Sequence, residues 1–164
     1  MSELDDFIAR ILPRLLEAGD AAHNGDPTRF LEMWSTNDPV SLFPAFSPGQ
    51  SGWDAVTRTM SAVGSRFSNG TPLTFELVAA EVSGDLAYTV GYERSSVSVD
   101  GGPVKPNNLR VTHIYRRENG DWRLVHRHGD FGPSGPPALD RFKADTTSPA
   151  QAKHAGAAHD PGEA

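Results

Sequence analysis

Residues 110–130 have the sequence RVTHIYRRENGDWRLVHRHGD, which contains a clear hairpin pattern. Apolar and polar side chains alternate on either side of Glu118-Asn119-Gly120-Asp121, which contains the Asn-Gly pair typical of tight hairpin turns. In a strand, alternation places successive side chains on opposite faces. The stretch therefore predicts two antiparallel strands, 109–118 and 122–130, joined by a short turn.

Two further strands are predicted upstream of this hairpin, at 73–82 and 86–99. The turn sequences Ser83-Gly84-Asp85 and Asp100-Gly101-Gly102-Pro103 separate them from their neighbours. Long strands connected in this way by short turns predict an antiparallel meander.

The first part of the chain has helical spacing instead. Apolar residues within 4–16 form one stripe, but Pro13 lies inside it, so this helix is either kinked there or begins later. A second helix is expected after Asp26, which suits the N-cap position, with Pro27 as its first residue. A short strand at 40–43 and a third helix at 52–64 follow. Helices that precede a strand meander indicate an α+β fold.

Length and composition exclude several classes of protein. The chain has 164 residues, which fits one domain, and it contains no Cys, which excludes disulfides and thiolate metal sites. Its formal charge is −6, so no nucleic-acid partner is expected. No apolar run reaches the about 20 residues of a membrane span, and the acidic N-terminus is unlike a secretory signal. We therefore expect a cytoplasmic protein with no membrane contact.

The end of the chain differs from the rest in composition. Residues 144–164 are rich in Gly, Pro, Ala and small polar residues, and they contain no apolar cluster able to offset the entropy of ordering. We expect a disordered tail at 144–164 after a domain that spans residues 1–143.

The hairpin of residues 110–130 resembles the last hairpin of the SnoaL-like branch of the nuclear transport factor 2-like superfamily, which includes ketosteroid isomerase. It is also similar to the association domain of calcium/calmodulin-dependent protein kinase. Upstream, Phe30-Leu-Glu-Met-Trp34, Asp38-Pro-Val-Ser-Leu-Phe43 and Gly52-Trp-Asp-Ala-Val56 agree with the same pattern. The resemblance covers roughly residues 20–132.

The resemblance implies a cone-shaped, cystatin-like roll, in which a curved antiparallel sheet wraps around N-terminal helices. Such a cone leaves an apolar pocket at its open end, where a small-molecule ligand is expected. The superfamily includes isomerases, cyclases, dehydratases and non-catalytic modules, so the fold alone does not choose the chemistry. The resemblance also implies a homodimer formed through the outer face of the sheet.

Candidate site residues follow from the faces of the strands. A pocket face should be mostly apolar with a few polar groups, which favours the face of His113 and Tyr115 and the face of Tyr92 and Arg94. On the last strand, alternation places the following residues on one face: Trp122, Leu124, His126, His128 and Asp130. The sequence leaves open which face of each strand points inward.

His113 is the first catalytic candidate, because an imidazole titrates near neutral pH. The alternative is a histidine held by a neighbouring hydroxyl group within the sheet. Arg94 could hold a carboxylate or an enolate, or it could form an ion pair with Glu93 or Glu76 instead. Alignment with the kinase association domain places that domain's pocket arginines at Arg94, His113 and Gly129, so this chain keeps one of these cations and offers an imidazole in place of another.

Asp38 lies where ketosteroid isomerase-like proteins often place an acid near the pocket. Its carboxylate could act as a base if aromatic neighbours raise its pKa. The alternative is an ordinary turn-forming pair with Pro39.

His126-x-His128 with Asp130 has the spacing of metal ligands on one strand face. No further cluster of ligands accompanies these residues, and the resembling families contain similar His-x-His pairs without metal. We therefore expect neither a metal nor another cofactor.

Together these observations predict a SnoaL-like pocket protein. Its expected activity is cofactor-free proton transfer, of the isomerase, cyclase or dehydratase type, on a small apolar carbonyl compound. The catalytic candidates are His113, Asp38 and Arg94. The ligand-binding candidates are Tyr92, Tyr115, Trp34, Phe43, Trp53, Arg127, His126 and His128. The alternative is a non-catalytic module that binds a ligand or dimerises, so the sequence leaves open whether the protein is an enzyme.

Overall fold

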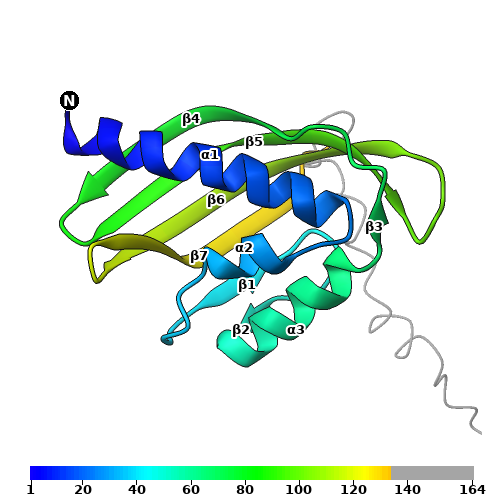
Figure 1. The fold of residues 1–164 in the computed structure, drawn as a ribbon, viewed down its shortest axis with the longest axis horizontal. Coiled ribbons are helices and arrows are strands. Elements are labelled where there is room, and N and C mark those ends of the chain that lie inside the picture. Colours follow the sequence, from blue (N-terminus) through cyan, green and yellow to red (C-terminus); the bar gives the residue numbers. More distant parts are fainter. Residues whose placement is uncertain (134–164) are drawn as a thin grey trace, which may run out of the picture. The chain divides into compact units, whose positions relative to one another are not determined.

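The predicted long strands form the greater part of a seven-stranded sheet (Figure 1). They are β4 (Thr74–Ser83), β5 (Leu86–Val99), β6 (Lys105–Glu118) and β7 (Asp121–Phe131). The computed structural model describes residues 1–133, of which Met1–Gly132 form one unit. The predicted domain end at residue 143 and the predicted tail at 144–164 lie outside the described residues.

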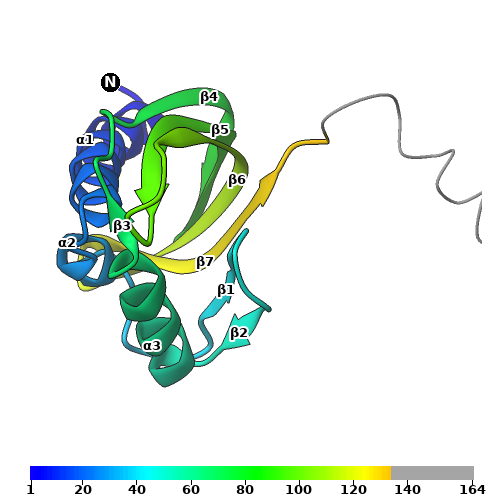
Figure 2. The same ribbon diagram turned by 90° about the vertical axis from the view of Figure 1, so that its right-hand side faces the viewer.

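Short strands complete the sheet: β1 (Ser41–Phe43), β2 (Gln50–Ser51) and β3 (Phe67–Ser68). The order across it is β2-β1-β7-β6-β5-β3, and β4 also pairs with β5. The sheet is antiparallel except that β1 runs parallel to β7. Figure 2 shows that β4 to β7 curl strongly, which confirms the α+β class and the curved sheet.

The helices are α1 (Glu3–His23), α2 (Thr28–Glu32) and α3 (Trp53–Gly64). α1 lies along the concave side of the sheet, and α2 and α3 follow at one end of it (Figures 1 and 2). Within residues 1–133, no helix is both long enough and apolar enough to cross a membrane.

The starts of the first two helices have identifiable causes. Ser2 and Asp5 form a capping box, in which each side chain accepts a hydrogen bond from the backbone N–H of the other residue. α1 continues through Pro13, whose side chain is exposed, so the alternative of a later start is excluded. α2 begins at Thr28 rather than at Pro27, and the backbone N–H of Thr28 donates to the Asp26 carboxylate at 3.0 Å.

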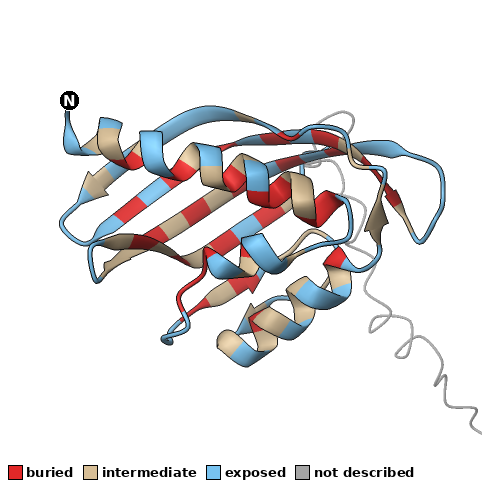
Figure 3. Ribbon diagram, in the orientation of Figure 1, coloured by how far each residue is buried: buried red, intermediate tan, exposed pale blue. Residues whose placement is uncertain are grey.

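The core lies between α1 and the concave face of the sheet, where Figure 3 shows buried segments on both. Phe7, Ile11 and Leu15 of α1 are fully buried. The Phe7 ring packs edge-on against Tyr115 and Trp122, with centroid distances of 5.3 and 5.2 Å. Burying an aliphatic or aromatic side chain of this size contributes about 1.5–3 kcal/mol. Helix and sheet therefore stabilise each other along this stripe.

A β-bulge at Val125 interrupts the alternation of β7. Ile114 of β6 pairs with His126 and Tyr115 pairs with Leu124, so Val125 has no partner on β6. Such an extra residue moves every later side chain of the strand to the opposite face.

The bulge therefore exchanges the two faces of β7. Leu124 is buried before it, and Arg127 and Gly129 are buried after it. His126 and His128 point instead to the outer face of the sheet, by which we mean the face away from α1. The prediction that these two histidines share a face with Leu124 is wrong, because it assumed unbroken alternation.

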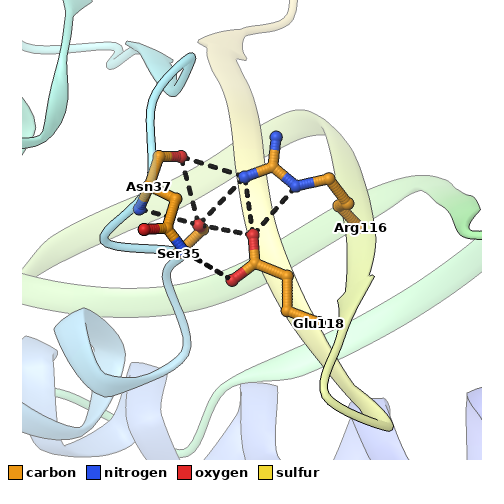
Figure 4. Close-up of polar contacts among 4 residues, drawn as sticks. All are labelled: Ser35, Asn37, Arg116 and Glu118. Carbon is orange, nitrogen blue, oxygen red and sulfur yellow. Dashed lines mark hydrogen bonds and ion pairs between the residues drawn. The ribbon is translucent and has the colours of Figure 1, made fainter.

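Four polar residues tie the segment before β1 to the β6–β7 hairpin (Figure 4). Glu118 accepts hydrogen bonds from the Ser35 hydroxyl at 2.7 Å and from Arg116 at 2.6 Å. Arg116 also donates to the backbone carbonyl of Asn37 at 2.9 Å. The Ser35 hydroxyl, together with Arg116, lowers the pKa of Glu118. This polar cluster fixes the backbone directly before Asp38 and β1.

Candidate functional site

A pocket lies between α1, α3 and the sheet, beside the loop that follows β1. Its wall is mostly apolar and includes Phe30, Phe46, Met60, Val63, Phe67 and Leu109. The free volume is about 60 Å³, well below the roughly 300–1,000 Å³ of sites for drug-sized ligands. The pocket therefore suits a small molecule.

Four buried polar residues also line this pocket, and we refer to them as the polar floor: His23, Glu93, Asn107 and Arg127. Each comes from a different element: His23 belongs to the last turn of α1, Glu93 to β5, Asn107 to β6 and Arg127 to β7. The curl of the sheet and the position of α1 bring these distant parts of the sequence together.

Glu93 and Arg127 form a buried ion pair. Arg127 Nη2 donates to Glu93 Oε2 at 2.6 Å. Arg127 is only 8% exposed and Glu93 only 4%. The Phe30 ring supports the guanidinium, with 5.8 Å between Arg127 Cζ and the ring centroid. Gly129 leaves space for it, because a Cβ at this position would lie 2.8 Å from Arg127 Nη1. Since Arg127 reaches this face only through the bulge, the pair depends on the bulge.

His113 is fully buried and lies beside the Glu93 carboxylate. Thr89, His113 and Arg127 form one row across β5, β6 and β7. Nδ1 of His113 lies 3.1 Å from the Thr89 hydroxyl, and Nε2 lies 3.6 Å from Glu93 Oε1. Burial, assisted by the charges of Arg127 and His126, lowers the pKa of His113 well below its ordinary value. The ring is therefore neutral at neutral pH.

His23 and Asn107 complete the polar floor. His23 Nε2 lies 3.5 Å from Asn107 Nδ2, and the His23 ring packs edge-on against Phe67. Burial lowers the pKa of His23, while the negative charge of Glu93 acts in the opposite direction. The floor thus holds a carboxylate and a neutral imidazole, which are both groups that can exchange protons.

Several polar atoms of the floor have no hydrogen-bond partner within residues 1–133. They are His23 Nδ1, Glu93 Oε1, Asn107 Oδ1 and Arg127 Nε. A buried polar atom without a partner costs about 1–3 kcal/mol. Such atoms are uncommon in folded proteins, and each calls for an explanation, such as a catalytic role or a bound water, ion or ligand. A ligand that pairs with them would recover part of this cost.

Arg127 lines the pocket, whereas the other predicted residues of the inward face do not. His113 does point inward, but its contact with the Thr89 hydroxyl matches the alternative of a histidine held within the sheet. Tyr115 and Trp34 belong to the core, with 0% and 2% exposure. Burial also raises the pKa of Tyr115, so its hydroxyl stays protonated.

Tyr92 and Arg94 lie on the outer face of the sheet, so the prediction that their face lines the pocket is wrong. Tyr92 is 38% exposed. Arg94 forms an ion pair with Glu76 at 2.9 Å, which matches the alternative for this arginine. The neighbouring Glu93 occupies the inward position instead.

His126, His128 and Phe43 also lie away from the pocket. The Phe43 ring packs edge-on against both imidazoles, with centroid distances of 5.6 and 5.4 Å. His126 Nδ1 is 2.7 Å from the Ser41 hydroxyl. In the part of the chain that the structure describes, no group of three His, Asp or Glu residues is placed to hold a metal ion.

Asp38 and Trp53 meet at the start of α3. The exposed Asp38 carboxylate accepts a hydrogen bond from the Trp53 backbone N–H at 3.1 Å. A carboxylate in this position is stabilised by the helix dipole. Neither residue lines the pocket. Asp38 therefore has a structural role at the start of α3, which is closer to the turn-forming alternative than to that of a catalytic base.

Sequence reasoning missed Glu93, His23 and Asn107. One signal could have found Glu93: it shares a strand face with Thr89, and Thr89 pairs directly with His113. An inward His113 therefore requires an inward Glu93. His23 follows the predicted apolar stripe, and Asn107 precedes the predicted strand, so no pattern distinguished them.

Comparisons with known proteins agree with this fold. A sequence profile of the SnoaL-like domain matches residues 13–131. A nuclear transport factor 2-like protein of Salmonella enterica serovar Typhimurium is 20% identical, with a TM-score of 0.65 over 84% of this chain and 96% of that chain. A protein of the same superfamily from Streptomyces avermitilis, provisionally named a dehydratase, is 21% identical, with a TM-score of 0.63 over 79% and 99%.

A more distant structure, from Xanthomonas campestris, is provisionally named an association domain of calcium/calmodulin dependent protein kinase II. It is 14% identical, with a TM-score of 0.55 over 80% of this chain and 88% of that chain. No curated protein sequence matches significantly.

The structural similarities establish the fold, and the profile establishes the family. The matched residues 13–131 include the second half of α1, the polar floor and the hairpin from which the resemblance started. The chain therefore belongs to the SnoaL-like family, and its fold is similar to that of nuclear transport factor 2-like proteins.

Proposed function

We propose that this protein catalyses cofactor-free proton transfer at carbon, on a small and largely apolar carbonyl compound, with Glu93 as the base. One observation carries this proposal: Glu93, one of whose carboxylate oxygens has no hydrogen-bond partner, belongs to the polar floor of a pocket whose wall is mostly apolar. Carboxylates commonly act as general bases, and a carbonyl compound bound against the apolar wall would hold its carbon-bound hydrogen beside the polar floor.

The ion pair with Arg127 suits this chemistry. When Glu93 takes a proton from the carbon next to a carbonyl, the C–H electron pair moves to the carbonyl oxygen and forms an enolate. Neutralisation of Glu93 leaves the Arg127 charge without its partner at the moment when the enolate charge develops. The guanidinium can then stabilise the enolate, which an exposed cation would do less well. In an isomerisation, the proton returns from Glu93 to another carbon of the conjugated enolate. In a dehydration, the enolate electron pair forms a C=C bond and expels the β-hydroxyl group, which takes the proton from Glu93 and leaves as water.

His113 acts in this proposal as a positioning residue. Its Nε2 lies 3.6 Å from Glu93 Oε1, and the Thr89 hydroxyl holds its other nitrogen. The predicted base role of His113 and of Asp38 thus passes to Glu93, which lines the pocket as they do not. The provisional name of the Streptomyces avermitilis protein is compatible with a dehydration, although that similarity concerns the fold alone.

A second candidate is a non-catalytic binding module, and one observation favours it. Phe46 and Phe67 both line the pocket and pack edge-on, with 5.6 Å between ring centroids. Aromatic side chains at a pocket wall favour retention of a ligand. In this case Glu93 would orient the ligand without reacting.

Exchange of carbon-bound hydrogen for deuterium separates the two candidates. A panel of small ketones and β-hydroxy ketones is incubated in D₂O with the protein, and deuterium incorporation next to the carbonyl is followed by NMR. The Glu93→Gln variant keeps the size of the side chain and a hydrogen bond to Arg127, but it cannot accept the proton. It should lose about a hundredfold or more of the exchange rate.

Glu76→Gln is the matched control. It removes one carboxylate from the outer face, where Glu76 is exposed and pairs with Arg94, and it should exchange at the wild-type rate. Circular dichroism confirms that each variant is folded. Equal exchange by wild type and Glu93→Gln would remove Glu93 from the mechanism, and no exchange by either protein would favour the binding module.

A further inference from the structure

We infer that the ligand of this pocket is an uncharged molecule that carries a hydrogen-bond donor next to its carbonyl group, such as an amide or a hydroxy ketone. The inference concerns the same site as the proposed function and names its ligand class. It requires only that the pocket binds a ligand, because it makes no use of turnover.

The charges of the polar floor exclude a preference for anions. Arg127 is the only Lys or Arg among the pocket-lining residues of the described chain. Its guanidinium is already paired with Glu93 at 2.6 Å. An anionic ligand that approached Arg127 would therefore also meet the Glu93 carboxylate, and repulsion by the carboxylate would offset the attraction of the cation.

The two nearby histidines add no positive charge at neutral pH. His23 and His113 are both buried, and their pKa values lie below the ordinary value for that reason. The floor as a whole is thus close to neutral. A cation would gain little from it as well, because the negative charge of Glu93 is already paired.

The unpaired acceptors call for a donor on the ligand. Glu93 Oε1 and Asn107 Oδ1 are buried acceptors without a partner in the described chain. An N–H or O–H group can satisfy such an atom, whereas a simple ketone cannot.

The unpaired donors call for an acceptor on the same ligand. His23 Nδ1 and Arg127 Nε lack partners as well. His23 Nδ1 is a donor in one of the two neutral tautomers, and Arg127 Nε is a donor in every state. Because the free volume is about 60 Å³, the donor and acceptor of the ligand must lie close together. Primary amides and hydroxy ketones have this arrangement.

Three probes of nearly equal size test the inference: isobutyramide, isobutyrate and methyl isopropyl ketone. The first is neutral and carries a donor, the second is an anion, and the third is neutral without a donor. Binding to the full chain at neutral pH is measured by ligand-observed NMR. Isobutyramide should bind about tenfold more tightly than either of the others, as expected when buried polar groups are left unpaired by the wrong ligand.

The Glu93→Gln variant should reverse the preference. It leaves Arg127 with a positive charge that no carboxylate balances, so isobutyrate should become the tighter ligand, by about tenfold. Glu76→Gln, on the outer face, should keep the wild-type order of the three probes. If Glu93→Gln does not fold, the order of the three probes on wild type decides the matter alone.

Tighter binding of isobutyrate than of isobutyramide by wild type would overturn the inference. The same holds if isobutyramide fails to bind at its highest soluble concentration, or if a folded Glu93→Gln variant keeps the wild-type order. Preference for the amide with no deuterium exchange on any substrate would leave the inference standing and remove only the proposed catalysis. Deuterium exchange together with a preference for isobutyrate would leave the proposed catalysis standing and overturn only the inference about the ligand.

Discussion

At the scale of single residues, Glu93 and Arg127 illustrate how a buried charge is tolerated. Removing a carboxylate and a guanidinium from water carries a large desolvation penalty, which their mutual attraction offsets only when the geometry is good. The 2.6 Å hydrogen bond and the Phe30 ring supply such a geometry. One oxygen of the carboxylate nevertheless remains unpaired, which is an arrangement that stability alone would not favour.

A double-mutant comparison should reveal this balance. Arg127→Met leaves the Glu93 charge buried without compensation and should lower the free energy of unfolding by about 3–5 kcal/mol. Adding Glu93→Met should restore most of that loss, because two apolar side chains of similar volume carry no desolvation penalty. Urea unfolding of wild type, the single variant and the double variant gives the three values. A double variant no more stable than the single one would mean that the pair is not buried as described.

At the scale of secondary-structure elements, much of the fold could be predicted from the sequence. The Asn119-Gly120 turn and the regular alternation gave the β6–β7 hairpin within a few residues, and the turn at Gly84 gave the boundary between β4 and β5. These features depend on local backbone preferences, which a short stretch of sequence contains.

The facing of the strands could not be predicted in the same way. On β5 the aromatic Tyr88 and Tyr92 are partly exposed, while the smaller Thr89 is fully buried. A pattern that expects the largest apolar side chains inside therefore selects the wrong face. Gly91 explains part of this, because a Cβ at its position would lie 2.3 Å from the Glu76 carbonyl oxygen. β4 and β5 approach too closely there for a larger side chain.

The site was harder to predict than the elements, for two physical reasons. A glutamate in a strand is usually exposed, so Glu93 gave no sign of burial until its cross-strand partners were known. The bulge at Val125 leaves no mark on the local pattern, yet it decides that Arg127 is inside and His128 is outside. Both facts arise from contacts between elements, which a single strand sequence does not contain.

At the scale of the whole molecule, the buried histidines should make stability depend on pH. In the unfolded chain a histidine titrates near about 6.5, whereas burial lowers the folded pKa of His23 and of His113. Below about pH 6.5 the unfolded state therefore binds more protons, and the free energy of unfolding falls as the pH decreases. For His113, the charged or titratable neighbours that modulate this effect are Glu93, Arg127 and His126.

His113→Gln tests this expectation. Each histidine of this kind contributes a slope of at most about 1.4 kcal/mol per pH unit. Wild type should lose stability between about pH 7 and pH 5, and the variant should lose less over the same range. Urea unfolding at several pH values provides the measurement. Parallel curves for the two proteins would show that His113 becomes protonated in the folded state as readily as in the unfolded state.

The outer face of the sheet is the surface on which we expect two copies of the chain to associate. Val78, Tyr88 and Tyr92 are 61%, 37% and 38% exposed. Val78 and Tyr92 line one shallow cleft together with Thr112 and His128. Partly apolar faces of this kind, related by a two-fold axis, are a common basis for dimers.

Static light scattering should therefore report a dimer at about micromolar concentration, within the usual range of specific interfaces. Val78→Asp should shift the mass toward that of the monomer, because the new carboxylate would be buried without a partner. Val104→Asp, on the loop between β5 and β6 at 50% exposure, is the control and should remain dimeric. A wild-type protein that stays monomeric as its concentration is raised would contradict the expectation.

The bulge at Val125 has a consequence for how this protein can vary. β7 consists of two short segments whose side chains alternate in opposite phase. Leu124 is buried in the first segment and Arg127 is buried in the second. Removing or adding one residue at the junction would exchange the interior and exterior sets of the second segment together, so that His126 and His128 would take the place of Arg127 and Gly129 on the pocket side. A family member that lacks the extra residue should therefore have a pocket floor of a different chemical kind, even where every neighbouring side chain is the same.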